Sequence, residues 1–228
     1  MKLAEGKSGR LDVVIDSLDD VKSDDAANRV LDKVNPDIVV WSAGAGGKGG
    51  AERTKAVDEV AAKHYITASL TRPSVKKFLM VSYIGSRKGR PSWWSDEDYD
   101  KAQEVNTKVL PAYYKAKVEA DEHFLALTHQ RNVTNGDKSF QGINLRPGAL
   151  TDDASNGKVL LGKTPSRGKV GRESVARVAA ELLFRDDTRG WYDLLDGDED
   201  VEHAVDRVVN EKWDGVEGED LDRIYNRV

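Results

Sequence analysis

Cysteine is absent from this chain of 228 residues, and long apolar runs are absent as well. Without cysteine the protein has no disulfide bonds, no thiolate nucleophile and no cysteine-ligated metal. No stretch approaches the ~20 consecutive apolar residues that a membrane-spanning helix needs. The opening residues 1–6 also lack the apolar core of a secretory signal. These absences predict a cytoplasmic protein without membrane partners.

Strong charge of either sign is also missing, since the formal net charge is −5 at pH 7. A basic surface is the usual mark of a nucleic-acid-binding protein, so nucleic acid is not expected as a partner. The hydrophobic fraction of 39% and the chain length predict one globular domain, 1–228. The histidines have no i, i+4 pairing, so no metal site is expected. They are His64, His123, His129 and His203.

Short apolar runs alternate with segments of helical periodicity along most of the chain. The predicted strands cover 11–16, 37–42, 77–82, 142–147 and 191–195. The predicted helices cover 24–34, 51–70, 102–130 (kinked at Pro111), 173–184 and 201–212. This order predicts parallel strands joined by right-handed crossovers. Because the strands are apolar throughout rather than alternating, helices should cover both faces. The expected fold class is α/β, a doubly wound and mostly parallel sheet.

Three regions outside these elements have interpretations of their own. Residues 87–100 are polar, contain Trp93-Trp94, and are predicted to form a lid or insertion loop. Residues 213–228 are predicted to be an acidic C-terminal tail or a short last helix. Residues 157–164 fit the phosphate-loop pattern Gly-x-x-x-x-Gly-Lys-Thr, but polar residues precede them and bulky Val159-Leu160-Leu161 fills the loop. A nucleoside-triphosphate site is therefore not expected there.

The best candidate for chemistry is Tyr113-x-x-x-Lys117 in the long predicted helix. A spacing of four places the phenol and the ammonium on one face, a turn apart. A nearby ammonium stabilises a phenolate, so this tyrosine can act as a general acid or base near neutral pH. Ser82 ends a predicted strand, where α/β sheets place ligand-contacting residues, and its hydroxyl can polarise a carbonyl. The alternative is that Tyr113 is packing and Lys117 a solvated face, since the chain has seven tyrosines.

Four segments follow one another with a characteristic spacing: 37–44, 78–86, Tyr113-x-x-x-Lys117 and 145–150. Their order resembles that of the atypical branch of the short-chain dehydrogenase/reductase family. The resemblance implies a Rossmann-like fold, NAD or NADP as cofactor, and hydride transfer on a small carbonyl or alcohol substrate. The residues that match the family's catalytic set are Ser82, Tyr113 as the acid, and Lys117, which holds the nicotinamide ribose.

The resemblance also implies which residues contact the dinucleotide. The loop after the second predicted strand would lie against the cofactor, and the segment after the first would approach its adenine. The implied cofactor-binding residues are Ser17, Asp19, Ala43, Gly44, Ala45, Gly46, Lys117, Arg146, Pro147 and Gly148. The family's residue that selects NAD or NADP lies on a strand without a counterpart here, so the preference is not readable. By the same resemblance, the helix over 102–130 is a candidate homodimer face.

The family's pattern opens with a strand, Gly-x-x-Gly-x-x-Gly and a helix that hold the pyrophosphate, and no such segment is found in this sequence. The first recognisable strand, 11–16, corresponds to the family's third. The expectation is therefore an N-terminally incomplete Rossmann-like domain, a truncated form of the family. Three functions stay open: an NAD(P)-dependent oxidoreductase, a non-catalytic dinucleotide sensor or interaction protein, and an inactive fragment. Dinucleotide binding with turnover would indicate the oxidoreductase, binding without turnover the sensor, and no binding the inactive fragment.

Overall fold

The computed structural model describes residues 11–228, in which eight strands and eight α-helices mostly alternate. The strands are β1 (Ile38–Trp41), β2 (Lys77–Val81), β3 (Gln141–Pro147), β4 (Ala149–Thr151), β5 (Lys158–Leu161), β6 (Lys169–Gly171), β7 (Gly190–Asp196) and β8 (Glu199–Asp200). The helices are α1 (Asp24–Val34), α2 (Gly50–Thr54), α3 (Ala62–Leu70), α4 (Asp96–Glu104), α5 (Pro111–His129), α6 (Arg172–Phe184), α7 (Val201–Asn210) and α8 (Leu221–Tyr225). The opening residues, for which no secretory signal is predicted, lie outside the described residues.

Six strands form one sheet in the order β1-β2-β3-β7-β5-β8. The first four of these are parallel, with Leu79 of β2 opposite Val40 on one side and Ile143 on the other. Parallel neighbours require long crossovers, and the helices between the strands supply them. Strands β5 and β8 are added antiparallel at the far edge. The prediction of a mostly parallel, Rossmann-like α/β fold is confirmed.

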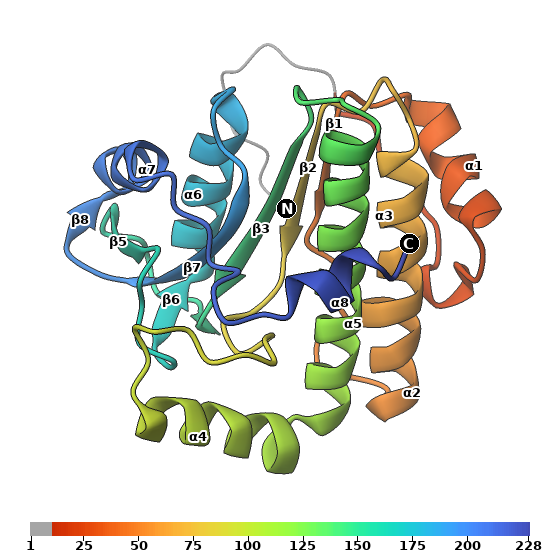
Figure 1. The fold of residues 1–228 in the computed structure, drawn as a ribbon. Helices are drawn as coiled ribbons and strands as arrows, with labels where there is room; N and C mark the ends of the chain where they lie inside the picture. Colours follow the sequence, from red (N-terminus) through yellow and green to blue (C-terminus); the bar gives the residue numbers. More distant parts are fainter. Residues whose placement is uncertain (1–10) are drawn as a thin grey trace.

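Helices cover both faces of the sheet, as the continuous apolar strands predict (Figure 1). Phe78 and Met80 of β2 pack into the core formed with α1, α3 and α5. Leu79 points to the other face, into the core formed with α6 and α7. Successive side chains of one strand therefore serve two separate cores. The carboxyl ends of the parallel strands lie at the lower edge of the view, where α4 crosses beneath the sheet.

The strand predicted over 11–16 is wrong. These residues have no regular structure, and their side chains are exposed, with Val13 77% and Ile15 95% accessible. A strand is stable only when a neighbour accepts its backbone hydrogen bonds and one of its faces is buried. Neither condition is met for this run among the described residues, because β1 pairs with β2 alone. Apolar composition by itself did not decide its structure.

The long helix predicted over 102–130 is two helices. Residues 96–109, of α4 and its π-helical extension, precede a break at Leu110, whose ψ of 42° is outside the helical range. Pro111 then occupies the first turn of α5, where its missing N–H costs no hydrogen bond. The predicted kink is thus a complete break. The polar region 87–100 accordingly contains the start of α4, capped by Ser95, rather than loop alone.

The segment that imitates a phosphate loop is a strand. Residues Lys158–Leu161 form β5, and both Val159 and Leu161 are buried against α7 and β7. The bulky residues that count against a phosphate loop therefore have a structural role. Sequence patterning did not predict β5, nor the short strands β4, β6 and β8.

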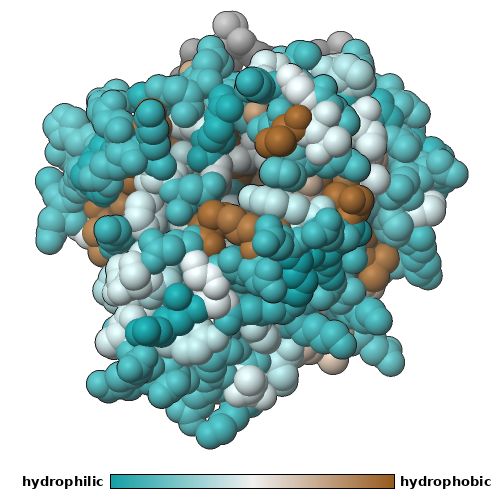
Figure 2. All heavy atoms as spheres, in the orientation of Figure 1, coloured by the Kyte–Doolittle hydropathy of each residue, from teal (hydrophilic) through white to brown (hydrophobic). Residues whose placement is uncertain are grey.

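The surface is largely hydrophilic on the face that Figure 2 shows, with small separate apolar spots. Within residues 11–228, no helix combines the length and the apolar character that crossing a membrane requires.

Candidate functional site

Two cavities adjoin at the carboxyl ends of β1, β2 and β3. The first, of about 540 Å³, is bordered by Ala102 and Asn106 near α4, and is called the α4 cavity here. The second, of about 610 Å³, is bordered by the glycine loop 42–50 and is called the glycine-loop cavity. Four residues line both cavities, which places them at the junction. They are Ser82, Leu110, Tyr113 and Leu150.

Tyr113 reaches this junction from the first turn of α5. Its ring packs against that of Tyr83, with 5.0 Å between the centroids. Burial raises the pKa of Tyr113 above its ordinary value of 10, and the negative charges of Asp58 and Asp121 add to the rise. The expected lowering of this pKa by Lys117 is therefore not found, because burial, and after it the two carboxylates, raise the pKa instead. Tyr113 is a protonated phenol, suited to donate a proton.

Lys117 lies one turn further along α5 and is 1% exposed. Its Nζ donates a hydrogen bond to the carbonyl oxygen of Val81 at 3.1 Å, at the end of β2. Burial lowers the pKa of this ammonium, while the carboxylates of Asp121 and Asp58 act in the opposite sense. Lys117 borders the glycine-loop cavity and not the α4 cavity. The alternative of a solvated surface lysine is therefore wrong.

The Ser82 side chain contacts Asp121, a residue that none of the sequence motifs includes. Its hydroxyl donates to Oδ2 of Asp121 at 2.8 Å, and both residues are buried. Burial raises the pKa of Asp121, against the lowering effects of Lys117 and Arg146. The other oxygen, Oδ1, has no hydrogen-bond partner among the described residues. Asp121 stands four residues after Lys117 on the same helix face, so the i, i+4 spacing could have identified it.

Asp58 holds the glycine loop in place. Its Oδ2 accepts a hydrogen bond from the backbone N–H of Ala45 at 3.0 Å, and the side chain is buried. A Cβ at Gly44 would lie 2.8 Å from Oδ1 of Asp58, so only glycine fits there. Burial raises the pKa of Asp58, against the effect of the Ala45 hydrogen bond and the Lys117 charge. No local motif marks Asp58, because its partner is thirteen residues away in a loop.

The glycine loop itself has a backbone that other residues rarely adopt. Gly46, Gly47, Gly49 and Gly50 all have positive φ angles, between 63° and 82°. Such a loop exposes its backbone to the glycine-loop cavity without side chains in between. This open backbone permits close approach of a nicotinamide ring and its ribose. The loop, Lys117 and the two hydroxyl groups of the junction are together a fitting set for the reactive end of a dinucleotide.

The structure brings together some of the predicted cofactor residues and separates others. Ala43, Gly44 and Gly46 line the glycine-loop cavity, and Ala45 lies buried behind it. Pro147 and Gly148 line the α4 cavity.

Like Ala45, three further predicted residues border neither cavity. Ser17 is exposed, and Asp19 pairs with Arg53 at 3.2 Å. Arg146 is fully buried, donates to the carbonyl oxygen of Ile84 and pairs with Asp193 at 3.1 Å. Its observed contacts are those of a buried ion pair within the fold.

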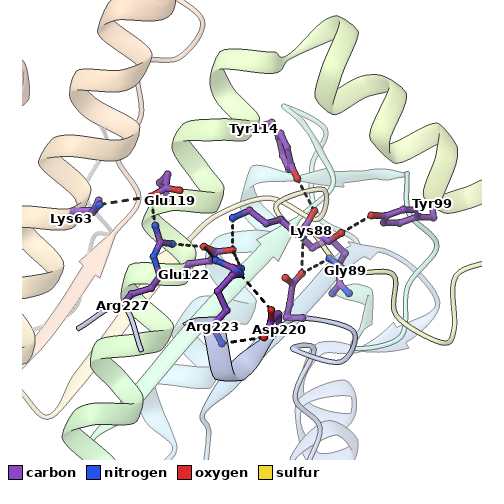
Figure 3. Close-up of polar contacts among 12 residues, drawn as sticks. Lys63, Lys88, Gly89, Tyr99, Tyr114, Glu119, Glu122, Asp220, Arg223 and Arg227 are labelled. Atoms are coloured by element: carbon purple, nitrogen blue, oxygen red, sulfur yellow. Dashed lines mark hydrogen bonds and ion pairs between the residues drawn. The ribbon is translucent and has the colours of Figure 1, made fainter. Parts of the chain in front are cut away.

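The segment after β2 is tied to the C-terminal segment, as Figure 3 shows. Lys88 and Arg223 converge on Glu122 of α5, at 2.9 Å and 2.6 Å, and Arg227 also contacts Glu122. Glu219 accepts hydrogen bonds from the backbone N–H groups of Lys88 and Gly89. The region predicted as a lid and the region predicted as an acidic tail are thus packed together against α5.

Comparisons with known proteins agree with this geometry. Residues 2–186 match the profile of a family described as NAD(P)H-binding. The chain is 32% identical over 196 residues to the UPF0659 protein C216.03 of Schizosaccharomyces pombe, covering 83% of this chain and 73% of that one.

Two solved structures share the fold. A putative NAD-dependent epimerase/dehydratase from Bacillus halodurans is 25% identical, with a TM-score of 0.60 over 79% of this chain and 72% of that one. The oxidoreductase ylbE from Lactococcus lactis is 21% identical, with a TM-score of 0.62 over 86% and 77%.

Proposed function

Because the chain belongs to the NAD(P)H-binding family, with NAD or NADP as its cofactor, we propose that it is a reductase of small carbonyl compounds. One observation carries this proposal: Ser82 and Tyr113 line both cavities, at the place where the cavities adjoin. A dinucleotide in one cavity and a carbonyl compound in the other would meet at these two hydroxyl groups. The similarity to a putative NAD-dependent epimerase/dehydratase and to an oxidoreductase agrees with nicotinamide chemistry.

The glycine-loop cavity suits the nicotinamide end of the cofactor. Its walls are the open backbone of the glycine loop and the ammonium of Lys117, which can donate to ribose hydroxyl groups. Asp58 keeps the loop in its position through Ala45, so the wall is formed before any ligand arrives. Preorganisation of this kind lowers the free-energy cost of binding.

The chemistry divides between the cofactor and the chain. When bound, NADH or NADPH supplies the hydride. Tyr113 supplies the proton that the carbonyl oxygen gains, because burial keeps its phenol protonated. Lys117, one turn along the helix, offsets the phenolate charge that then forms. Ser82 polarises the same oxygen when its proton turns from Asp121 to the substrate.

The test is reduction of an aldehyde by NADPH or NADH, compared between the wild type and Y113F. Removing the phenol hydroxyl should lower kcat by about 10²–10⁴-fold, the usual contribution of a general acid, and leave cofactor affinity unchanged. Y114F is the matched control, because the Tyr114 hydroxyl donates to the carbonyl oxygen of Arg87 and borders neither cavity. Cofactor affinity is followed by nicotinamide fluorescence.

Each contrary result has its own meaning. Unchanged turnover in Y113F would remove Tyr113 from the reaction. Binding of a dinucleotide without any turnover would favour the sensor. Absence of binding at about millimolar NADH and NADPH, a free energy weaker than about −4 kcal/mol, would overturn the proposal altogether.

A further inference from the structure

The α4 cavity has a second polar wall, away from Tyr113. Ser166 and Arg167 come from the connection between β5 and β6, and Arg172 begins α6. The backbone N–H of Ala149 donates to the carbonyl oxygen of Gly168 at 2.9 Å, which fixes this connection beside β4. None of these residues borders the glycine-loop cavity. If the proposed function is right, the wall belongs to the substrate side of the site.

Ser166 has a buried hydroxyl group that lines the α4 cavity. The residue is 3% exposed, it lines the cavity, and its Oγ has no hydrogen bond among the described residues. Most buried polar groups in native proteins have a hydrogen-bond partner, and an exception calls for a physical reason. A polar atom of a bound substrate would supply the missing hydrogen bond.

Arg167 is a cation that has no counter-ion in the part of the chain that the structure describes. It is exposed at the cavity and makes no ion pair or side-chain hydrogen bond within residues 11–228. Arg172 pairs with Asp152 at 2.7 Å, but the two side chains are 57% and 92% exposed, so water competes for this pair. The wall therefore offers two guanidinium groups, of which one is unpaired, next to an unsatisfied hydroxyl.

We propose that this wall binds an oxyanion, a carboxylate or a phosphate, and that the substrate is an anionic carbonyl compound with an apolar body. This inference rests on the proposed function, because it assigns the substrate of the same site. A guanidinium group matches both oxyanions with two parallel hydrogen bonds, and the Ser166 hydroxyl adds a third donor. Much of the remaining lining, including Ile84, Val105 and Leu110, is apolar and suits a hydrocarbon body.

Affinity for three matched aldehydes tests the proposal. The probes are para-formylbenzoate, para-formylphenyl phosphate and methyl para-formylbenzoate, titrated calorimetrically into the protein with NADP⁺ present. At least one of the two anions should bind about tenfold or more tightly than the neutral ester, since hydrogen bonds to a charged group are strong. The choice between them identifies the oxyanion. Equal affinity for the ester and both anions, or no binding of either anion, would overturn the proposal.

Substitutions of Arg167 and Ser166 test whether this wall causes the preference for anions. R167Q should lose about 10–100-fold in affinity for the preferred anion and nothing for the ester, and S166A should lose less. K169Q is the control, because Lys169 has the same charge two residues away but does not line the cavity. An equal loss in K169Q would mean a general charge effect and contradict a defined subsite. A loss of NADPH affinity in R167Q would assign the arginine to the cofactor instead.

The two proposals can fail separately. Reduction of all three aldehydes at the same kcat/KM would leave a reductase and remove the oxyanion wall. Binding of an anion that depends on Arg167, with no reduction by NADPH or NADH, would keep the wall and remove the reductase.

Discussion

Helix α5 has two charged clusters, and they differ in how their charges are satisfied. The inner cluster, Lys117 and Asp121, faces Ser82 and the cavities. The outer cluster, Glu119 and Glu122, faces the C-terminal segment. In both clusters a buried carboxyl group lies near basic side chains. The clusters differ in the hydrogen bonds that this carboxyl group accepts: Asp121 accepts one from the Ser82 hydroxyl, whereas Glu122 contacts Lys88, Arg223 and Arg227.

The pKa values of Asp121 and Glu122 are shifted in opposite directions. Burial raises the pKa of Asp121, and the nearby charges of Lys117 and Arg146 and the hydroxyl groups of Ser82 and Ser86 do not offset this rise. Burial acts on Glu122 in the same sense, but hydrogen bonds from Arg223 and Lys88 hold its pKa below the ordinary 4.5. A negative charge therefore costs free energy at Asp121 and stabilises the fold at Glu122. Perturbed, incompletely satisfied groups are typical of functional sites, and saturated ones of structural contacts.

Among the charge substitutions, K117M, which removes the cation of the inner cluster, should lower the free energy of unfolding most. K117M leaves the buried carboxyl groups of Asp58 and Asp121 without the positive charge that favours their ionised form. Loss of one member of a buried charged group usually lowers the free energy of unfolding by about 3–5 kcal/mol. Urea unfolding at neutral pH measures this change. K115M is the control, since Lys115 is exposed on the same helix, and its effect should stay within about 0.5 kcal/mol.

The loss in K117M should depend on pH with a definite sign. Without Lys117 the folded-state pKa of both carboxyl groups rises further above 3.8, so the folded state binds more protons than the unfolded state. Stability must then fall as pH rises through that window, and the difference from the wild type must shrink in acid. A loss that is the same at acidic and neutral pH would mean that the carboxyl groups play no part.

The sequence could predict the sheet because its parallel strands are buried on both faces. The run 78–81 is apolar throughout, and its side chains do enter two cores. The run 11–16 is also rich in apolar residues, but no strand pairs with it among the described residues, and strand pairing depends on the tertiary structure. The strand β5 escaped prediction for a related reason: its short run is held by pairing with β7 and by burial of Val159 and Leu161, which are tertiary contacts.

The candidate site was predictable in part. Ser82, Tyr113 and Lys117 do meet at one place, as strand ends and helix spacing predict. The i, i+4 spacing from Lys117 could also have identified Asp121. Asp58 was not, because its role depends on the path of a loop. The placement of Arg146 in a buried ion pair depends on Asp193 in β7, which the motif around it does not contain.

An intermediate effect is expected for the outer cluster. E122Q keeps the shape of the side chain but removes the charge that Lys88, Arg223 and Arg227 share. Hydrogen bonds to charged groups are worth about 1.5–3 kcal/mol, and the freed cations can return to water, so the loss should lie in that range. Urea unfolding measures it. Turnover should be unchanged, because Glu122 borders neither cavity; a fall in kcat without a loss of stability would contradict the division between the clusters.

The stability difference between E122Q and the wild type should also shrink in acid, but for another reason than in K117M. The pKa of Glu122 is lowered in the folded state, so its contribution is complete above 4.5 and is lost as pH falls through the folded-state value. The difference between E122Q and the wild type must therefore shrink below pH 4.5 for this reason, with Glu122 becoming protonated. A difference that grows in acid would reverse the assignment.

The smallest effect is expected for E119Q, which sharpens the comparison within the outer cluster. Glu119 and Glu122 lie on one helix and share Arg227, but their side chains are 25% and 2% exposed. Glu119 also has Lys63 at 3.9 Å, too long for a hydrogen bond. A partly exposed pair is screened by water, so E119Q should cost less than about 1 kcal/mol in urea unfolding. If E119Q costs as much as E122Q, the number of cations rather than burial determines how much a carboxylate stabilises α5.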